Sequence, residues 1–249
     1  ADPRDFDLGA LRAMDIGAAA IPPDLFARLL EAFGPRIGII YGLTEAPWCC
    51  YQPPSAFAVD GAARVLRMRS VGRALFGVEI ALRSPEGRPV ANGEEGEVTL
   101  RGAHVTPGYW QRPEADAAAF RDGWFHTGDL GVIDAEGYLS ITGRIKDLIR
   151  SGGRSVVPAE VEAALRANDA VADAAVIGLP DAEWGEIVAA AVVLRPGADA
   201  DEAQLIESCR THLSAFKKPR RIFFVTEIPR SHYGKMMRSR LLQLITETS

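Results

Sequence analysis

The chain has 249 residues, of which 47% are hydrophobic and 24% charged, and its formal net charge is −5. This length suffices for one large or two modest hydrophobic cores. The low net charge, with acids and bases interleaved, argues against a nucleic-acid-binding surface. No apolar run approaches the roughly 20 residues that cross a bilayer, so we expect no transmembrane segment.

The cysteines and the N-terminus bear on the cellular compartment. Cys49 and Cys50 are adjacent, Cys209 is remote, and neighbouring cysteines seldom bond to each other. We therefore expect no disulfide framework and a reducing, cytoplasmic setting. The first residues, ADPRDFDLGALRAMDIG, lack an initiating Met and the basic and apolar parts of a signal peptide, which suggests a chain entered in mid-domain.

The first part of the chain alternates one helical pattern with several strand patterns. Apolar spacing predicts a helix over 22–33, and a β-branched run predicts a strand over 37–41. Alternating residues between turn signals predict antiparallel strands over 77–83 and 96–102. The glycine-punctuated stretch 131–143 predicts a hairpin.

The remaining residues show a different pattern, in which predicted helices and strands follow one another in regular succession. The predicted elements are a helix over 158–167, strands over 171–179 and 186–194, a helix over 201–213, a strand over 221–225 and a helix over 235–245. This order predicts a separate α+β domain of about a hundred residues, a usual domain size. We place the boundary between residues 145 and 146.

Four short segments combine residue types that suit nucleotide chemistry, and the first is YGLTE (41–45) at the end of the 37–41 strand. The carboxyl ends of strands are where α/β sheets place ligands. The Thr44 hydroxyl and the Glu45 carboxylate could hold a phosphate oxygen and Mg²⁺. Alone, the segment also fits a surface turn in which Thr44 caps a helix, and that interpretation is the commoner one.

The second segment is WFHTGD (124–129). Asp129, held on a glycine turn, could accept both hydrogen bonds from a ribose diol through its two carboxylate oxygens. The alternative is an ordinary Asx-turn.

The third segment, GRIKDLIRSGGR (143–154), flanks apolar residues with four cations. Its Ser-Gly-Gly turn exposes backbone N–H groups of the kind that bind anions. The alternative is a solvated basic face that leads into a capped helix.

The fourth segment, PRSHYGKMMR (229–238), presents Lys235 directly after a glycine loop. Its ammonium could neutralise charge on a departing phosphate. The alternative is a surface lysine at a helix start.

Together these segments resemble the adenylate-forming superfamily, which includes acyl-CoA synthetases, peptide-synthetase adenylation domains and beetle luciferases. The motifs that carry the resemblance are YGLTE (41–45), GEVTLRGAHVTPGYW (96–110), WFHTGD (124–129), GRIKDLIRSGGRSVVPAEVE (143–162) and PRSHYGKMMR (229–238). They cover essentially the whole chain. The wording of the 143–162 block is most like that of acyl-CoA synthetases.

The resemblance implies a fold of mixed class, α/β and α+β. Residues 1–145 would form the C-terminal portion of the large AMP-binding domain, with its β-sheet and β-barrel subdomains. Residues 146–249 would form the small mobile C-terminal domain. In this family a carboxylate attacks the α-phosphate of ATP to give acyl-AMP and pyrophosphate, and a thiol, usually that of CoA, then displaces AMP.

The resemblance also assigns roles to single residues. Thr44 matches the phosphate-contacting threonine and Glu45 the magnesium-associated glutamate. Asp129 matches the ribose-binding aspartate, Arg144 the arginine at ribose and phosphate, and Lys235 the lysine that assists adenylation. The residues that correspond to the walls around adenine and substrate are Gly17, Ala18, Ala19, Ala20, Tyr41 and Gly42.

A second group of residues concerns the domain rotation and the thiol. Lys146 matches the family's hinge, and Gly152, Gly153 and Arg154 match the loop that approaches CoA. One small domain cannot offer both Lys235 and the 152–154 loop to one site at once. A rotation between the two half-reactions is therefore a geometric requirement of these assignments.

The chain departs from the family pattern in two respects. The family's Ser/Thr/Gly-rich phosphate loop is absent, so we expect it upstream, and we expect this chain alone to be inactive. Ile40 stands where many relatives have a small residue before the tyrosine. It could shorten an acyl pocket, which would favour a small or medium acid, or it could merely pack in the sheet.

Two alternatives to an acyl-CoA synthetase stay open at this point. The chain could be part of an adenylation domain that loads an amino acid onto a carrier-protein thiol. It could also be a non-catalytic module that only binds a nucleotide or a partner, as the missing phosphate loop allows. Retention of the five motif residues Thr44, Glu45, Asp129, Arg144 and Lys235 favours an active parent enzyme.

Overall fold

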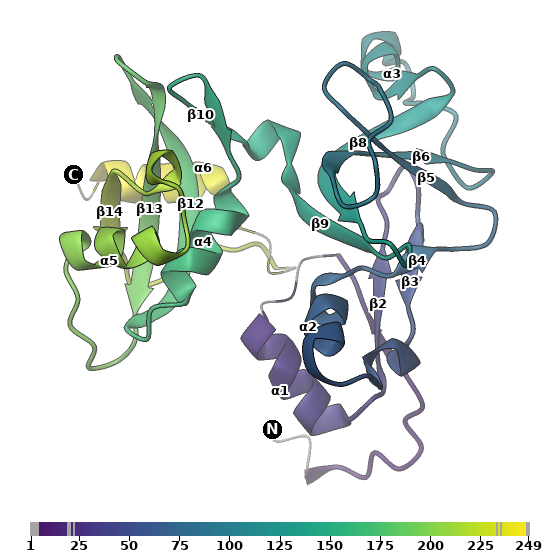
Figure 1. Cartoon of the computed structure of the whole chain (residues 1–249), viewed down its shortest axis with the longest axis horizontal. Coiled ribbons are helices and arrows are strands. Elements are labelled where there is room, and N and C mark those ends of the chain that lie inside the picture. Colours follow the sequence, from purple (N-terminus) through teal and green to yellow (C-terminus); the bar gives the residue numbers. More distant parts are fainter. Residues whose placement is uncertain (1–4, 19–20, 22, 233, 235, 248–249) are drawn as a thin grey trace. The chain divides into compact units, whose positions relative to one another are not determined.

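The computed structural model describes residues 5–18, 21, 23–232, 234 and 236–247. The chain forms two compact units, Ala1–Ile141 and Thr142–Ser249 (Figure 1). The division falls four residues before the boundary predicted from the sequence.

The first unit begins with a four-stranded sheet of order β1-β2-β3-β4, in which β1 and β2 are parallel and the other pairs antiparallel. One face packs against α1, whose buried residues Phe26 and Leu30 meet Ile37 of β2 and Phe57. The elements up to the end of this sheet are β1 (Met14–Ile16), α1 (Pro23–Phe33), β2 (Ile37–Tyr41), β3 (Cys50–Gln52), η2 (Pro54–Phe57), α2 (Gly61–Arg69) and β4 (Arg73–Ala74).

The second sheet of this unit is antiparallel, with the order β5-β6-β8-β7 and with β9 paired to β8. Its core contains Leu82, Val98, Leu100, Phe125 and Leu139, all of them buried. The neighbours of Leu82 and Phe125 along their strands are half-buried, whereas in β6 the run Val98–Leu100 is buried throughout. The elements are β5 (Glu79–Arg83), β6 (Glu95–Arg101), α3 (Pro113–Ala119), β7 (Phe120–Arg121), β8 (Trp124–Ile133) and β9 (Leu139–Arg144).

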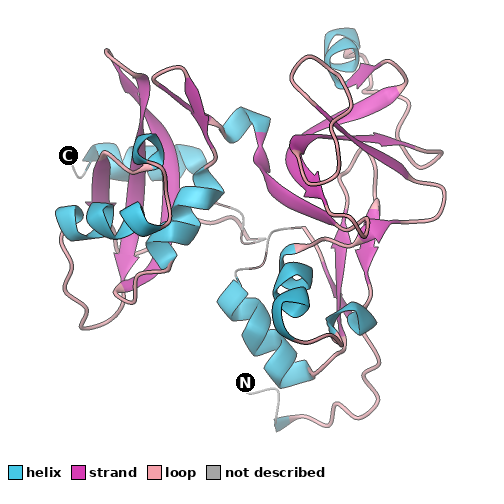
Figure 2. Cartoon of the chain, viewed as in Figure 1, coloured by secondary structure: helices cyan, strands magenta, loops and turns pink. Residues whose placement is uncertain are grey.

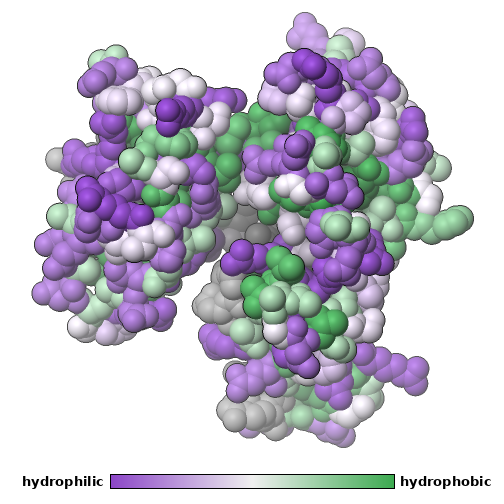
Figure 3. All heavy atoms as spheres, viewed as in Figure 1, coloured by the Kyte–Doolittle hydropathy of each residue, from purple (hydrophilic) through white to green (hydrophobic). Residues whose placement is uncertain are grey.

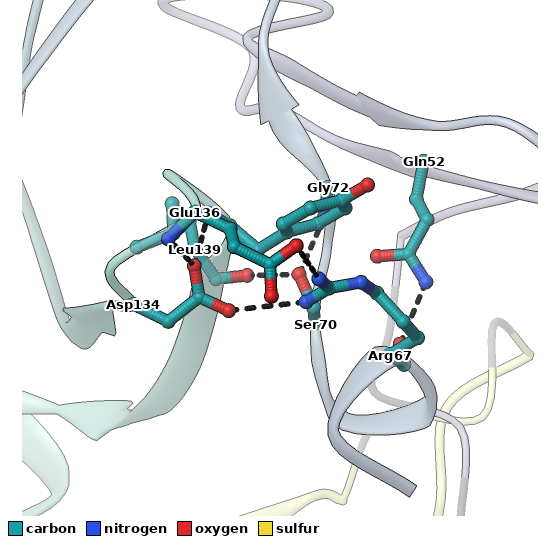
Figure 4. A network of polar contacts seen from close by, with 8 residues as sticks. Gln52, Arg67, Ser70, Gly72, Asp134, Glu136 and Leu139 are labelled. Carbon is teal, nitrogen blue, oxygen red and sulfur yellow. Dashed lines mark hydrogen bonds and ion pairs between the residues drawn. The ribbon is translucent and has the colours of Figure 1, made fainter. Parts of the chain in front are cut away.

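A buried arginine on α2 fixes the turn between β8 and β9 (Figure 4). Arg67 donates hydrogen bonds to Asp134 Oδ2 at 3.0 Å and to Glu136 Oε2 at 2.6 Å. Its guanidinium also lies 3.4 Å from the ring centroid of Tyr138. Only 7% of the Arg67 side chain is exposed, so α2 and the turn are joined by a charge that little water reaches.

Hydrogen bonds between side chains and the backbone continue this attachment beyond Arg67 (Figure 4). The Gln52 amide donates to Arg67 O at 2.6 Å, and the Ser70 hydroxyl donates to Leu139 O at 2.7 Å. Ser70 Oγ in turn accepts the Gly72 N–H at 2.9 Å. The start of β9 is therefore anchored to the segment between α2 and β4.

The second unit is an α+β sandwich around one five-stranded sheet, with helices on both faces (Figure 2). On one face α4 and α5 cover a core that includes Val161, Leu165 and Leu205. On the other face Leu241 and Ile245 of α6 are buried. The elements are η3 (Ile145–Asp147), β10 (Ile149–Ser151), β11 (Arg154–Val156), α4 (Pro158–Arg166), β12 (Val171–Asp181), β13 (Gly185–Leu194), α5 (Glu202–Ser208), η4 (Cys209–Thr211), η5 (Ala215–Lys217), β14 (Arg221–Phe224) and α6 (Arg238–Glu247).

Most of the predicted elements are confirmed. The predicted and observed elements differ mainly in the residues at which they begin and end. The strand over 37–41 has the predicted bounds. The helix predicted over 201–213 ends at Ser208, where a 3₁₀ turn follows. The helix predicted over 235–245 begins only at Arg238, because the Met237 N–H bonds back to Pro229 O and closes a loop instead.

The surface of each unit mixes hydrophilic and hydrophobic residues on the face drawn in Figure 3. No helix in the described part of the chain is long and apolar enough to span a membrane.

Candidate functional site

The YGLTE segment begins with Tyr41, the last residue of β2, and continues into the loop that leads to β3. Tyr41 pairs with Cys50, the first residue of β3. The loop closes on itself through a 2.7 Å bond from the Cys49 N–H to Tyr41 O. Gly42 is required there, because a Cβ at this position would lie 2.5 Å from the backbone nitrogen of Trp48. The Thr44 side chain is exposed and Glu45 is half-buried, so both residues can reach a ligand.

Glu45 is the residue to which the sequence analysis assigned a divalent cation. No cluster of three or more His, Cys, Asp or Glu side chains able to hold a metal occurs among the described residues. A single carboxylate fits Mg²⁺ that is bound mainly by phosphate oxygens and water, and it does not fit a cation held by protein alone. The site therefore suits a magnesium–nucleotide complex.

Asp129 lies against Tyr41, although 88 residues separate them in the sequence. The Tyr41 hydroxyl donates a 2.7 Å hydrogen bond to Asp129 Oδ2, and Asp129 is only 2% exposed. Burial, followed by the charge of Asp129, raises the pKa of Tyr41 well above its usual value. The proposed adenine wall and the proposed ribose ligand are thus brought together.

The WFHTGD segment is not the free-standing turn that its glycine suggested, because it lies inside β8. Register shifts between Glu97 and Thr99, so that residues 127–129 all lie opposite Val98. This bulge directs Asp129 inward. Thr127 stabilises it by donating to Val98 O at 2.7 Å and by accepting the Asp129 N–H at 3.0 Å.

Glu97 holds the glycine of this bulge from the neighbouring strand. Its Oε1 accepts the Gly128 N–H at 3.2 Å, and its Oε2 lies 2.7 Å from His126 Nδ1. Gly128 has a φ of +72°, which a side chain would make unfavourable. The orientation of Asp129 therefore depends on a carboxylate to which we assigned no role from the sequence.

The predicted substrate wall is described in part. Gly17 lies beside the backbone of β2, since a Cβ on it would be 3.1 Å from Ile40 O. Ala18 has a φ of +72°, a strained value for a residue other than glycine. Ala19 and Ala20 lie outside the described residues.

The structure shows on which face of β2 Ile40 lies. Its neighbour Ile39 packs into the core beneath α1. Successive strand residues point to opposite faces, so Ile40 points away from that core, and it is half-buried beside Gly17.

In the second unit the predicted CoA loop is a tight hairpin between β10 and β11. Ser151 pairs with Arg154, and the two glycines between them have φ values of +57° and +73°. These values fit a two-residue turn of the type that Gly-Gly favours. Gly152 has a second constraint, because a Cβ there would lie 2.7 Å from Cε3 of Trp184.

Aromatic rings and guanidinium groups gather beside this hairpin. Arg220 stacks over the Trp184 ring at 3.9 Å, and Arg154 lies 4.7 Å from the centroid of Phe216. Two pockets of about 390 and 220 Å³ adjoin them, and both include Trp184 and Arg220. The sequence analysis missed Trp184, Phe216 and Arg220, whose proximity depends on the fold of the sheet.

The residues at the start of the second unit include the proposed hinge. Arg144 ends β9 and is half-buried, while Lys146 is exposed within η3. The next residue, Asp147, accepts a 3.1 Å hydrogen bond from Arg238 at the start of α6. The residue that follows Lys146 is therefore tied to the body of the second unit.

Lys235 lies outside the described residues, but both sides of its loop are anchored. Arg230 donates to Gly234 O at 3.3 Å and to Asp173 Oδ2 at 2.7 Å. Arg230 and Met236 also form an antiparallel bridge. These contacts join Arg230 to Gly234, Met236 and Asp173.

Comparison with known proteins shows to which family these motifs belong. The AMP-binding enzyme family model matches residues 1–110, and the AMP-binding enzyme C-terminal domain model matches residues 160–235. The chain belongs to the adenylate-forming superfamily.

The superfamily relatives that the chain resembles include named CoA ligases. It is 46% identical over 237 residues to the 2-succinylbenzoate–CoA ligase of Geobacillus kaustophilus, covering 95% of this chain and 47% of the relative. It is 39% identical over 235 residues to the feruloyl-CoA synthase of an Amycolatopsis species, covering 94% and 46%. The chain thus spans about half the length of the curated relatives it matches.

Solved structures of superfamily members have the same fold. The amide bond synthetase McbA from Marinactinospora thermotolerans matches with a TM-score of 0.86 and 35% identity, over 97% of this chain and 49% of McbA. ATP-bound MatB from Rhodopseudomonas palustris matches with a TM-score of 0.85 and 36% identity, over 96% and 46%. The predicted mixture of α/β and α+β architecture is confirmed.

Proposed function

We propose that the complete protein activates a carboxylic acid with ATP and transfers the acyl group to CoA. By complete protein we mean a polypeptide that carries this chain together with the upstream phosphate loop that the reaction requires. The observation that carries the proposal is the joining of Tyr41 and Asp129, from two separate superfamily motifs, by a hydrogen bond.

In the first half-reaction an oxygen of the acid attacks the α-phosphorus, and the bond to the pyrophosphate oxygen breaks. We infer that Asp129 and Arg144 hold the ribose, that Thr44 contacts a phosphate, and that Tyr41, Gly42 and the Gly17–Ala19 segment surround the adenine and the acid. Magnesium bound through Glu45 would neutralise charge on the phosphates. Lys235 would stabilise the negative charge that develops in the transition state.

In the second half-reaction the thiol sulfur of CoA attacks the acyl carbon and AMP departs. The Gly152–Arg154 hairpin would line the path of the pantetheine arm, after a rotation about Lys146 has replaced Lys235 by this hairpin. The cluster of Trp184, Phe216 and Arg220 supports CoA as the acceptor. Aromatic faces can stack on its adenine, and guanidinium groups suit its phosphates.

The test is an acid-by-acid screen of the complete protein for pyrophosphate exchange and for CoA thioester formation. We expect exchange with one class of acid, followed by thioester formation with that acid. Ile40 beside Gly17 favours a small or medium acid over a long fatty acid. Exchange only with amino acids would instead support the carrier-loading alternative, and no exchange with any acid would support a non-catalytic module.

The acceptor is tested by a pair of variants. Trp184→Ala and Arg220→Ala should raise the KM for CoA and leave pyrophosphate exchange unchanged, because both residues lie on the proposed thiol side. An unchanged KM for CoA, with acyl transfer to an amine instead, would favour an amide-forming enzyme such as McbA, which the chain also resembles.

A further inference from the structure

We propose that Tyr109 is a positioning residue, which orients the Glu45 carboxylate so that one of its oxygens is presented to the divalent cation of the nucleotide. This inference rests on the proposed function. It concerns a tyrosine to which neither the sequence motif nor the superfamily comparison assigned a role.

The contact on which the inference depends joins two loops of the first unit. The Tyr109 hydroxyl donates a 2.8 Å hydrogen bond to Glu45 Oε1, across 64 residues of sequence. Among the described residues, the Tyr109 hydroxyl is the only hydrogen-bond partner of the Glu45 side chain. Oε2 of Glu45 therefore keeps its lone pairs for a ligand. The Glu45 backbone is also fixed, because its carbonyl accepts the Thr106 N–H at 2.7 Å.

Tyr109 is itself held at two further points, which makes it a rigid donor. Its backbone N–H donates to Asp116 Oδ1 at 2.7 Å, and Asp116 belongs to α3. The edge of its ring meets the ring of Phe120, with centroids 6.0 Å apart, and Phe120 packs on buried Phe125 at 5.1 Å. These contacts hold the Tyr109 ring in place, with its hydroxyl beside Glu45.

The neighbouring glycine has a matching requirement. Gly108 has a φ of +154°, and a Cβ there would lie 2.9 Å from both carboxylate oxygens of Asp116. The Asp116 carboxylate thus folds closely over the backbone of Gly108 and Tyr109. The Gly-Tyr pair in the 96–110 motif is explained by this arrangement, since a larger residue at 108 would displace the carboxylate that holds Tyr109.

A partner that orients a metal-ligating carboxylate typically contributes roughly 10- to 100-fold to metal affinity. Without the hydroxyl, the Glu45 side chain would sample several rotamers. The free energy needed to fix one of them would then reduce the affinity for the cation. We therefore expect the removal of one oxygen atom at Tyr109 to weaken cation binding while the fold is kept.

The experiment compares three versions of the complete protein: wild type, Tyr109→Phe and Tyr51→Phe. Tyr51 is the matched control, because its hydroxyl donates a 3.0 Å hydrogen bond to the carboxylate of Asp15 in the same unit. Mn²⁺ is titrated in the presence of a non-hydrolysable ATP analogue, and binding is followed by water-proton relaxation. Pyrophosphate exchange at varied Mg²⁺ is measured alongside.

For Tyr109→Phe we expect the half-saturating Mn²⁺ concentration to rise roughly 10-fold or more. Exchange should need correspondingly more Mg²⁺ and approach the wild-type rate at saturation. Glu45→Gln should show the same loss, and the double variant should be no worse than Glu45→Gln, since the two residues act through one contact. Tyr51→Phe should bind Mn²⁺ as the wild type does.

A Tyr109→Phe protein that binds Mn²⁺ like the wild type would overturn the inference and leave the proposed function standing, even if the variant were less stable. A wild-type protein without acid-dependent exchange would overturn the proposed function, and the inference with it.

Discussion

The hydroxyl of Tyr41, at the end of β2, donates a hydrogen bond to the carboxylate of Asp129, inside β8. The bond couples the two sheets of the first unit at the proposed nucleotide site. It also makes a phenol part of the folded structure, with a consequence for stability at alkaline pH.

We predict that the free energy of unfolding falls as the pH rises above about 10, the ordinary pKa of tyrosine. The pKa of Tyr41 is raised in the folded protein, chiefly by burial, so its stabilising effect is complete below pH 10 and is lost as the pH rises toward the folded pKa. Above pH 10 the unfolded state loses a proton that the folded state retains. Each such proton costs about 1.4 kcal/mol per pH unit.

Denaturant unfolding of the wild type and of Tyr41→Phe between pH 8 and 11 checks this prediction. The buried thiols of Cys49 and Cys50, whose pKa values burial also raises, contribute to the slope in both proteins. The Tyr41→Phe variant should therefore keep part of the pH dependence of the unfolding free energy. Its slope should be smaller by the contribution of one titrating proton. Identical slopes would show that Tyr41 does not titrate differently in the two states.

The attachment of α2 to the β8–β9 turn leads to a second prediction. Arg67→Met should lower the free energy of unfolding by about 1.5–3 kcal/mol, as expected for the loss of hydrogen bonds between charged groups that are partly buried. Arg101→Met is the matched control. Arg101 also bonds to a carboxylate, Glu79, but 49% of its side chain is exposed, and such surface pairs contribute at most about 1 kcal/mol.

The comparison is made by thermal or denaturant unfolding of both variants. Equal losses would contradict the view that burial makes the Arg67 cluster stronger than an ordinary surface pair.

Local patterns in the sequence predicted the elements, and the fold supplied most contacts of the site. The β-branched run at 37–41 and the alternation at 96–102 marked strands because their residues face a core on one side. Strands β3 and β4, with three and two residues, are too short to carry any period. A glycine before an aspartate looks the same in a turn and in a bulge, which is why the place of Asp129 in β8 was missed.

The contacts of Tyr109 and Trp184 could not be predicted for a different reason. Tyr109 meets Glu45 across 64 residues, and Trp184 meets Gly152 across 32. Such pairs depend on strand order and register, which single-sequence patterns do not specify. The motif containing Tyr109 was visible, but nothing local indicated that its hydroxyl would contact the magnesium-associated glutamate.

The two glycines of the β10–β11 hairpin give a third prediction. Both have positive φ, so alanine at either position costs about 1–2 kcal/mol of backbone strain. A Cβ at Gly153 would meet nothing within 4 Å, whereas one at Gly152 would press on the Trp184 ring. We expect Gly152→Ala to destabilise the protein more than Gly153→Ala and to raise the KM for CoA.

The measurements are the free energy of unfolding and the KM for CoA in thioester formation, made on both variants. Gly153→Ala is the internal control for backbone strain alone. If both raised the KM for CoA to the same extent, the displacement of Trp184 would not be the cause, and the ring would lose its proposed role in CoA binding.

The last prediction separates the two half-reactions. Lys235→Ala in the complete protein should abolish acyl-adenylate formation and spare thioester formation from supplied acyl-AMP. The motivation is that Lys235 and the Gly152–Arg154 hairpin belong to one domain, which cannot present both to one site in the same pose. Loss of one charge-stabilising donor typically lowers the rate by roughly 10²–10³-fold, and this loss should fall on pyrophosphate exchange alone. Gly152→Ala should show the opposite pattern, with exchange intact and thioester formation slowed. Equal loss of both half-reactions in Lys235→Ala would contradict a rotation about Lys146, because the lysine would then serve a single pose common to both steps.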